Sequence, residues 1–254
     1  MAVDEALLEG VERKQSRPWL RLYAWEPPCV SIGYAQPSAD IDHTRLAALG
    51  WDWVRRPTGG RAILHTDELT YSIVALGSDP RLAGGVLESY QRISLALLQA
   101  LHSLEIPSQS IPNRLTLGSK AGGPVCFEAP SNYEIVSQGK KIIGSAQARR
   151  KEAVLQHGSF PLWGDLTRIT EVLAFENEHE RTHAATSLLA HATTAEMVLG
   201  KPLSWQAVVQ AFVSAFQSEL NLELVPVALS AVESGRAREL VQEKYLHPAW
   251  LERI

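Results

Sequence analysis

The fold of this chain is decided by one stretch of sequence, Arg55-Arg56-Pro57-Thr58-Gly59-Gly60-Arg61-Ala62-Ile63-Leu64-His65. Adjacent glycines let the backbone adopt positive φ and let another molecule approach it closely. Apolar, β-prone residues flank the turn, so the pattern predicts a strand, a tight loop and a second strand. Arginines beside such a turn can present a fixed fork of N–H donors to an anion. We therefore expect a ligand to lie across the glycines; the alternative is an ordinary hairpin turn with solvated arginines.

Hydrophobic periods of two and 3.6 residues predict further strands and helices on both sides of this stretch. The predicted strands are residues 20–25, 29–34, 51–56, 62–65, 69–75, 133–136, 141–143 and 154–160. The predicted helices are residues 1–15, 44–49, 86–104 and a helical C-terminal part from about residue 204. Because strands dominate the middle, we expect an α+β fold with a mixed or antiparallel β-sheet flanked by α-helices. No Pro/Gly/Ser-rich linker interrupts the pattern, which predicts a single domain over residues 1–254.

Composition restricts the possible functions. The chain of 254 residues is 45% hydrophobic and 20% charged, which is ordinary for a globular protein. Its net charge of −4 and the lack of a basic run give no reason to expect nucleic-acid binding. No apolar run is long enough to span a membrane, and the acidic residues at 4, 5 and 9 do not fit a secretory signal. We therefore expect a cytoplasmic protein in which Cys29 and Cys126 are free thiols.

Two segments carry residues suited to acyl chemistry. Cys126 lies in the Gly- and Pro-rich segment 122–127, which we expect to be a loop where a thiol is accessible to a bulky substrate. The alternative is a small buried hydrophobe, as most free cysteines are; Cys29, beside Val30, fits that second description better. The second segment is the predicted strand that begins at Lys140 and Lys141. Since neighbouring side chains on a strand point to opposite faces, one lysine faces inward, where its ammonium group can stabilise an oxyanion.

The small residues Gly144, Ser145 and Ala146 follow that lysine pair and leave space for a ligand. The alternative for the pair is a solvated turn. His65 is either a base or a hydrogen-bonded structural residue. Tyr71 and Ser72 either face a pocket or hydrogen-bond each other. The histidines show no metal-ligand spacing, so no metal site is expected.

An ordered set of motifs carries a resemblance to a known family. The motifs are RLYAW (21–25), PPCVSIGYAQ (27–36), RRPTGGR (55–61), ELTYS (68–72), CFEAPSNYEI (126–135) and GKKIIGSAQ (139–147). Together they resemble the biotin/lipoate protein ligase superfamily and, within it, the lipoate-protein-ligase-like, cysteine-dependent octanoyltransferases. ATP-using ligases usually carry a third glycine where this chain has Arg61, and they generally lack the Cys-Phe pair. The resemblance covers most of the chain from Asp4 to about Leu162.

The resemblance implies a biotin/lipoate ligase catalytic-domain fold and an octanoyltransferase. It implies Cys126 as the acyl-accepting nucleophile and Lys141 as the residue that touches the acyl carbonyl. The substrate-binding residues are predicted to be Arg56, Thr58, Gly59, Gly60, Arg61, His65, Tyr71, Ser72, Gly144, Ser145 and Ala146. For the walls of an apolar acyl tunnel we expect Ile63, Leu64, Ile142 and Ile143.

The implied partners are octanoyl-acyl carrier protein as donor and, as acceptor, the glycine cleavage H protein or the lipoyl domains of 2-oxoacid dehydrogenases. A thioester is already activated, so we expect no cofactor, ATP or metal. Three alternatives stay open: an ATP-dependent lipoate-protein ligase, an octanoyl amidotransferase between lipoyl domains, and a non-catalytic lipoyl-domain binder.

Overall fold

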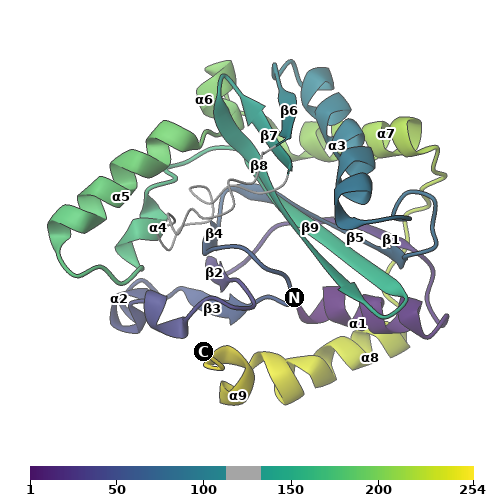
Figure 1. Cartoon of the computed structure of the whole chain (residues 1–254), viewed down its shortest axis with the longest axis horizontal. Coiled ribbons are helices and arrows are strands. Elements are labelled where there is room, and N and C mark those ends of the chain that lie inside the picture. Colours follow the sequence, from purple (N-terminus) through teal and green to yellow (C-terminus); the bar gives the residue numbers. More distant parts are fainter. Residues whose placement is uncertain (113–132) are drawn as a thin grey trace.

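The computed structural model describes residues 1–112 and 133–254, so the predicted nucleophile Cys126 and the segment 118–124 lie outside the described residues. Its main element is a six-stranded sheet in which every neighbouring pair is antiparallel (Figure 1). In spatial order its strands are β1 (Trp19–Tyr23), β5 (Glu68–Leu76), β9 (Ala153–Pro161), β8 (Lys140–Arg150), β7 (Tyr133–Ser137) and β6 (Gln109–Pro112).

A smaller sheet holds the loop of residues 56–62 that connects β3 to β4, here called the glycine loop. The strand order is β3 (Asp52–Arg55), β2 (Cys29–Ile32) and β4 (Ile63–His65), with β2 parallel to β3 and antiparallel to β4. The glycine loop therefore joins two strands that are not paired with each other, and it crosses the end of β2. This corrects the alternative of a simple hairpin turn, because β2 lies between the two strands.

Two helices that pack on each other, α3 (Val86–Ser103) and α7 (Trp205–Leu220), cover one face of the six-stranded sheet (Figure 1). On the other face, α1 (Ala2–Glu12) packs against β5 and β9 and is backed by α8 (Ala231–Leu240). Alternation along β5 assigns its residues to these faces: Leu69 and Tyr71 enter the core with α3 and α7, whereas Val74 packs with α1. The predicted α+β architecture with a mixed or antiparallel sheet flanked by helices is confirmed.

The remaining helices border the small sheet or close the chain. They are η1 (Ser38–Asp40), α2 (His43–Ala48), α4 (Arg168–Glu171), α5 (Glu178–His191), α6 (Ala195–Leu199), the π-helical turn η3 (Val241–Tyr245) and α9 (Pro248–Leu251). Residues of α2, α4 and α5 form a separate apolar core with β2, which includes Val30, Ile32, Leu46, Ile169 and Leu188. Over residues 1–112 and 133–254, none of the helices has the length and apolarity needed to cross a membrane.

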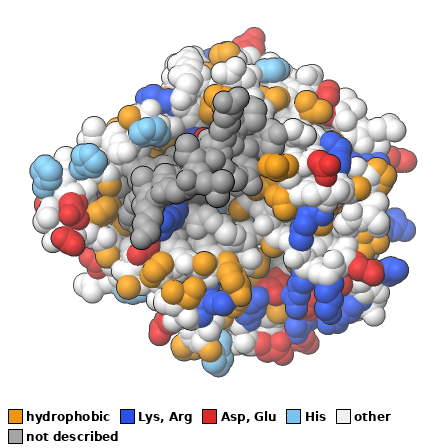
Figure 2. All heavy atoms as spheres, in the orientation of Figure 1, with side chains coloured by type: hydrophobic (Ala, Val, Ile, Leu, Met, Phe, Trp, Pro, Cys, Tyr) orange, Lys and Arg blue, Asp and Glu red, His pale blue; other side chains and the backbone are white. Residues whose placement is uncertain are grey.

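The acidic residues of α1 point into the protein. Asp4 is fully buried and accepts hydrogen bonds from Arg21, Tyr23 and Ser72. Glu5 accepts from Lys244, with Nζ–Oε distances of 2.7 Å. Basic and acidic side chains are interleaved over α1 and α8 in Figure 2. Helix α1 is thus fastened by ion pairs as well as by its apolar residues.

Candidate active site

The backbone at the end of β2 packs closely against the glycine loop. A Cβ atom placed on Gly33, just after β2, would lie 1.9 Å from the carbonyl oxygen of Gly60, which leaves no space for a side chain. Gly60 itself has a φ of +98°, a conformation that glycine adopts without strain. Glycine at position 33 and glycine at position 60 are therefore both required for the observed approach of β2 to the loop.

The side chain of Arg56 fixes the glycine loop through hydrogen bonds. Its guanidinium group donates to the carbonyl oxygens of Ser31 at 2.8 Å, Gly59 at 3.0 Å and Arg61 at 2.7 Å, and to Ser31 Oγ at 3.1 Å. The preceding Arg55 is fully buried and donates to carbonyls after β2 and in α9, among them Gln36 at 2.6 Å and Leu251 at 2.7 Å. In the structure these N–H groups bind backbone carbonyls and the Ser31 hydroxyl, and the binding of an anion by the two arginines stays a prediction.

A cavity lies between the two sheets, with an empty volume of about 600 Å³, part of it open to solvent. The small sheet and its loop contribute Ser31, Arg56, Gly59, Gly60, Ile63 and His65. The large sheet contributes Thr70, Lys141, Gly144, Ser145, Ala146, His157, Gly158 and Ser159. No described residue accepts a hydrogen bond from the N–H of Gly59 or Gly60. Two backbone donors in the cavity wall are thus available to a carbonyl oxygen or oxyanion.

Lys141 enters this cavity as the alternation on β8 predicts. Its side chain is buried, and Nζ lies 3.0 Å from Glu134 Oε1 on the neighbouring strand β7. Lys140, next to it, donates instead to the carbonyl of Leu189 near the end of α5, at 2.6 Å. The ion pair with Glu134 holds a charged ammonium group in the cavity wall opposite the glycine loop.

His65 is fixed by three neighbours. Its Nδ1 lies 2.5 Å from Glu68 Oε1, its Nε2 lies 2.7 Å from Ser31 Oγ, and its ring stacks on Trp25 with the ring centres 4.3 Å apart. Glu68 also accepts hydrogen bonds from the hydroxyl groups of Thr70 and Ser159. All these polar groups except Trp25 are buried, and together they form one hydrogen-bonded network along the cavity.

A second buried network begins at His157, which lines the cavity. Thr58 Oγ1 is 2.6 Å from Nε2 of His157, whose Nδ1 is 3.9 Å from Asp4 Oδ2. Burial opposes ionisation of Asp4, but His157 and the positive charge of Arg21 outweigh it and hold the pKa of that carboxyl well below its ordinary value. Burial lowers the pKa of His157, opposed by Asp4, so that its imidazole is neutral at neutral pH. Asp4 is therefore the permanent charge of this network.

The other predicted site residues lie outside the cavity lining. Thr58 hydrogen-bonds to His157, and the carbonyl oxygen of Arg61 accepts a hydrogen bond from Arg56. The hydroxyl of Ser72 donates to Asp4 at 2.7 Å. Tyr71 lies on the face of β5 that packs against α3 and α7, and its hydroxyl is 2.7 Å from Ser145 Oγ. Burial raises the pKa of Tyr71 to about 12, opposed by its hydrogen bonds to Ser145 and Gln156. Tyr71 and Ser72 thus neither pair with each other nor line the cavity.

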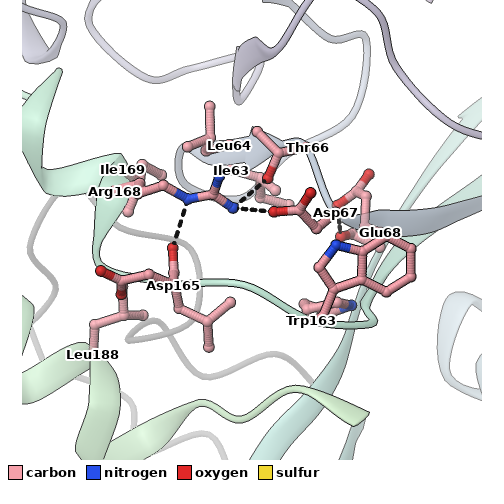
Figure 3. Close-up of a pocket in the computed structure, with 13 residues that line it drawn as sticks. Ile63, Leu64, Thr66, Asp67, Glu68, Trp163, Asp165, Arg168, Ile169 and Leu188 are labelled. Atoms are coloured by element: carbon pink, nitrogen blue, oxygen red, sulfur yellow. Dashed lines mark hydrogen bonds and ion pairs between the residues drawn. The ribbon is translucent and has the colours of Figure 1, made fainter. Parts of the chain in front are cut away.

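The tunnel residues expected from the sequence are divided among three environments. Ile63 lines the cavity, while Ile142 and Ile143 belong to the main apolar core instead. Leu64 lines a neighbouring pocket, shown in Figure 3, which shares Ile63 and Ser159 with the cavity. In that pocket Arg168 points between Thr66 and Asp67 and donates to both. An ion pair therefore already occupies its polar side.

Three polar residues of the site could not be singled out from the sequence. Ser31 is a single serine in the otherwise apolar strand β2, and Glu68 is the first residue of the strand β5. In the sequence, Asp4 looks like an exposed acidic residue of a surface helix. Cys29, in contrast, is buried as expected, and this burial raises its pKa to about 12. Among the residues described, no group of three histidine, cysteine or acidic side chains is arranged to hold a metal ion.

A family model described as the lipoyl protein ligase A/B catalytic domain matches residues 1–217. The chain belongs to this family. Octanoyltransferase LipM of Kyrpidia tusciae is 40% identical over 257 residues, covering 98% of this chain and 92% of that protein. Octanoyltransferase LipM of Moorella thermoacetica is 39% identical over 254 residues, covering 100% of this chain and 93% of that protein.

Solved structures of the family agree with the fold. A bipartite lipoate protein ligase from Thermoplasma acidophilum superposes with a TM-score of 0.80 at 24% identity, covering 99% of this chain and 91% of that chain. A lipoate-protein ligase A with bound ATP superposes with a TM-score of 0.78 at 25% identity, covering 99% and 92%. The family model and the LipM relatives confirm the predicted membership of the lipoate ligase superfamily.

Proposed function

We propose that this chain is an octanoyltransferase of lipoate biosynthesis that acts, as one catalytic domain, through a thioester on Cys126. The observation that carries the proposal is the cavity between the two sheets, where Lys141 and the two glycines Gly59 and Gly60, whose N–H groups have no acceptor among the described residues, line one space. The relatives' names supply the acyl group, and the sequence resemblance supplies the nucleophile.

In the first step, the thiolate of Cys126 attacks the thioester carbon of octanoyl-acyl carrier protein. The carbonyl oxygen gains negative charge, which the Lys141 ammonium and the two glycine N–H groups stabilise. The C–S bond to the carrier then breaks, and the carrier thiol leaves with a proton. Octanoyl is now bound to Cys126 as a thioester, so no ATP is needed at this step.

In the second step, the ε-amine of a lysine on a lipoyl domain or on H protein attacks the same carbonyl carbon. The C–S bond to Cys126 breaks and restores its thiolate, an amide forms as the amine gives its proton to solvent, which replaces the proton taken by the carrier thiol, and the same donors stabilise the oxyanion. The eight-carbon chain contributes about 0.8 kcal/mol for each methylene it buries. Gly158 lines the same cavity, and close packing requires a glycine there, because a Cβ would lie 2.6 Å from the carbonyl oxygen of Gly144 and against Tyr71.

Intact-protein mass spectrometry tests this proposal. The chain is mixed with octanoyl-acyl carrier protein without ATP, and an apo lipoyl domain is added afterwards. We expect an octanoyl adduct that moves to the lipoyl domain. Cys126→Ala should form no transferable adduct, whereas the matched variant Cys29→Ala should behave like the parent because that thiol is buried and does not line the cavity.

Other outcomes would replace the proposal. Modification of the lipoyl domain that requires lipoate and ATP and survives Cys126→Ala would identify an ATP-dependent ligase. Transfer from octanoylated H protein but not from the carrier protein would identify an amidotransferase. Docking without a mass change on either protein would identify a non-catalytic binder.

A further inference from the structure

The cavity contains a second set of residues arranged for acyl chemistry, apart from Cys126. Ser31, His65 and Glu68 form a continuous chain, with 2.7 Å between Ser31 Oγ and His65 Nε2 and 2.5 Å between His65 Nδ1 and Glu68 Oε1. Ser31 and His65 lie on one face of the small sheet, because Ser31 on β2 pairs with Ile63 on β4, two residues from His65. All three side chains are buried, and Ser31 and His65 both line the cavity.

Hydrogen-bond accounting fixes where the protons are. Glu68 Oε1 is an acceptor, since it already receives the hydroxyl proton of Thr70. In neutral imidazole one nitrogen donates and the other accepts, so Nδ1 of His65 carries the proton and Nε2 is the acceptor. Arg56 can only donate, and it donates to Ser31 Oγ at 3.1 Å. The hydroxyl proton of Ser31 therefore goes to His65 Nε2, which is the orientation in which a histidine activates a serine.

The surroundings supply the other requirements of serine-based acyl transfer. The Arg56 guanidinium places a positive charge beside Ser31 Oγ and, through Gly59 O at 3.0 Å, holds the loop whose residues Gly59 and Gly60 line the same cavity. The stack on Trp25 and the bond to Glu68 prevent the imidazole from turning. These fixed donors are the kind that stabilise a tetrahedral oxyanion.

We propose that Ser31, His65 and Glu68 form a Ser-His-Glu triad that gives the chain a second activity, the hydrolysis of medium-chain acyl thioesters and esters. Ser31 Oγ attacks the acyl carbon while His65 Nε2 takes its proton. The bond to the leaving thiol or alcohol breaks, and His65 returns the proton to it. Water then attacks the acyl-serine ester, giving its proton to His65, and the fatty acid leaves as Ser31 Oγ recovers a proton. The activity rests on the proposed function in one respect, that the cavity admits an acyl group.

The test measures p-nitrophenyl octanoate hydrolysis by the full chain carrying Cys126→Ala, which removes the thiol route. We expect hydrolysis above the uncatalysed blank, and we expect Ser31→Ala or His65→Gln in that background to lower it by about 10²-fold or more. The matched control is Ser94→Ala, since Ser94 is a buried serine on α3 that donates to the Gln91 carbonyl and does not line the cavity. It should leave the rate unchanged.

A second readout avoids substitutions at the triad. The unsubstituted chain is treated with an octyl fluorophosphonate, and the labelled peptide is mapped by mass spectrometry. Phosphonylation of Ser31 that is lost in His65→Gln supports the triad. A Cys126→Ala rate equal to the blank, a rate unaffected by Ser31→Ala, or the absence of label on Ser31 would overturn it. Octanoyl transfer is followed separately through Cys126, so failure of the triad and failure of the transferase give different patterns.

Discussion

Substitution of Gly33 by alanine tests whether the position of the glycine loop governs catalysis. The added Cβ would lie 1.9 Å from the Gly60 carbonyl oxygen, and real Cβ atoms essentially never approach within 3.0 Å, so the loop must move by about 1.1 Å. Gly60 belongs to the pair of N–H donors that we assign to the oxyanion. A misplacement of about 1 Å in such a site can cost about 10²-fold in rate.

We therefore expect kcat/KM for octanoyl transfer to fall about 10²-fold in Gly33→Ala. The free energy of unfolding should fall by about 1–3 kcal/mol, as overpacking usually causes, so the protein stays folded. Octanoylation of an apo lipoyl domain is measured by mass spectrometry, and stability is measured by urea unfolding.

Gly235→Ala on α8 is the matched control, because a Cβ there meets no atom within 4 Å. It should stabilise the helix by about 0.5–1 kcal/mol and leave transfer unchanged. A Gly33→Ala variant that folds and keeps the kcat/KM of the parent would refute the assignment of the loop to oxyanion stabilisation.

Three further predictions concern buried charges. Lys141→Met should lower single-turnover acylation of Cys126 by about 10²–10³-fold by removing an oxyanion donor, measured by quenched-flow mass spectrometry; parent-like acylation would exclude that role. Arg55→Met should lower the free energy of unfolding by about 3 kcal/mol or more, because each buried carbonyl left unpaired costs about 1–3 kcal/mol, and it should expose α9 to hydrogen exchange. Asp4→Asn should destabilise by about 3–5 kcal/mol at pH 7. Since the folded-state pKa of Asp4 is depressed, its contribution is complete above its unfolded pKa of about 4 and is lost progressively as pH falls toward the folded pKa, so the stability difference between parent and variant should narrow in acid urea titrations.

The sequence predicted the elements better than their pairing. Residues 62–65 and 86–104 were predicted as strand and helix, and β4 and α3 lie there because their apolar residues recur at the appropriate periods. The separation into two sheets could not be predicted, because it depends on β2 pairing with β3 and β4 on either side. Helix α5 was missed since it has only a weak apolar face, with Arg181, Ala184 and Leu188 buried.

The candidate site was predicted in part for similar reasons. Gly59, Gly60 and Lys141 stand beside recognisable turns, and all three line the cavity. Ser31 and Asp4 have no local signal, since one hydroxyl in an apolar strand or one acid on a helix is usually unrelated to function. Their importance comes from partners more than thirty residues away, His65 and Ser72, which periodicity does not connect.

The location of the cavity between two sheets has a consequence for refolding. Its walls come from Met1, from residues between 31 and 70 and from residues between 141 and 159, and the Thr58–His157 hydrogen bond joins positions 99 residues apart. Contacts between distant parts of a chain form late, because loop closure costs entropy before the contact stabilises anything. After dilution from denaturant, helical circular dichroism should therefore recover first. Octanoyl transfer should return in a slower phase, when the small sheet docks on the large one.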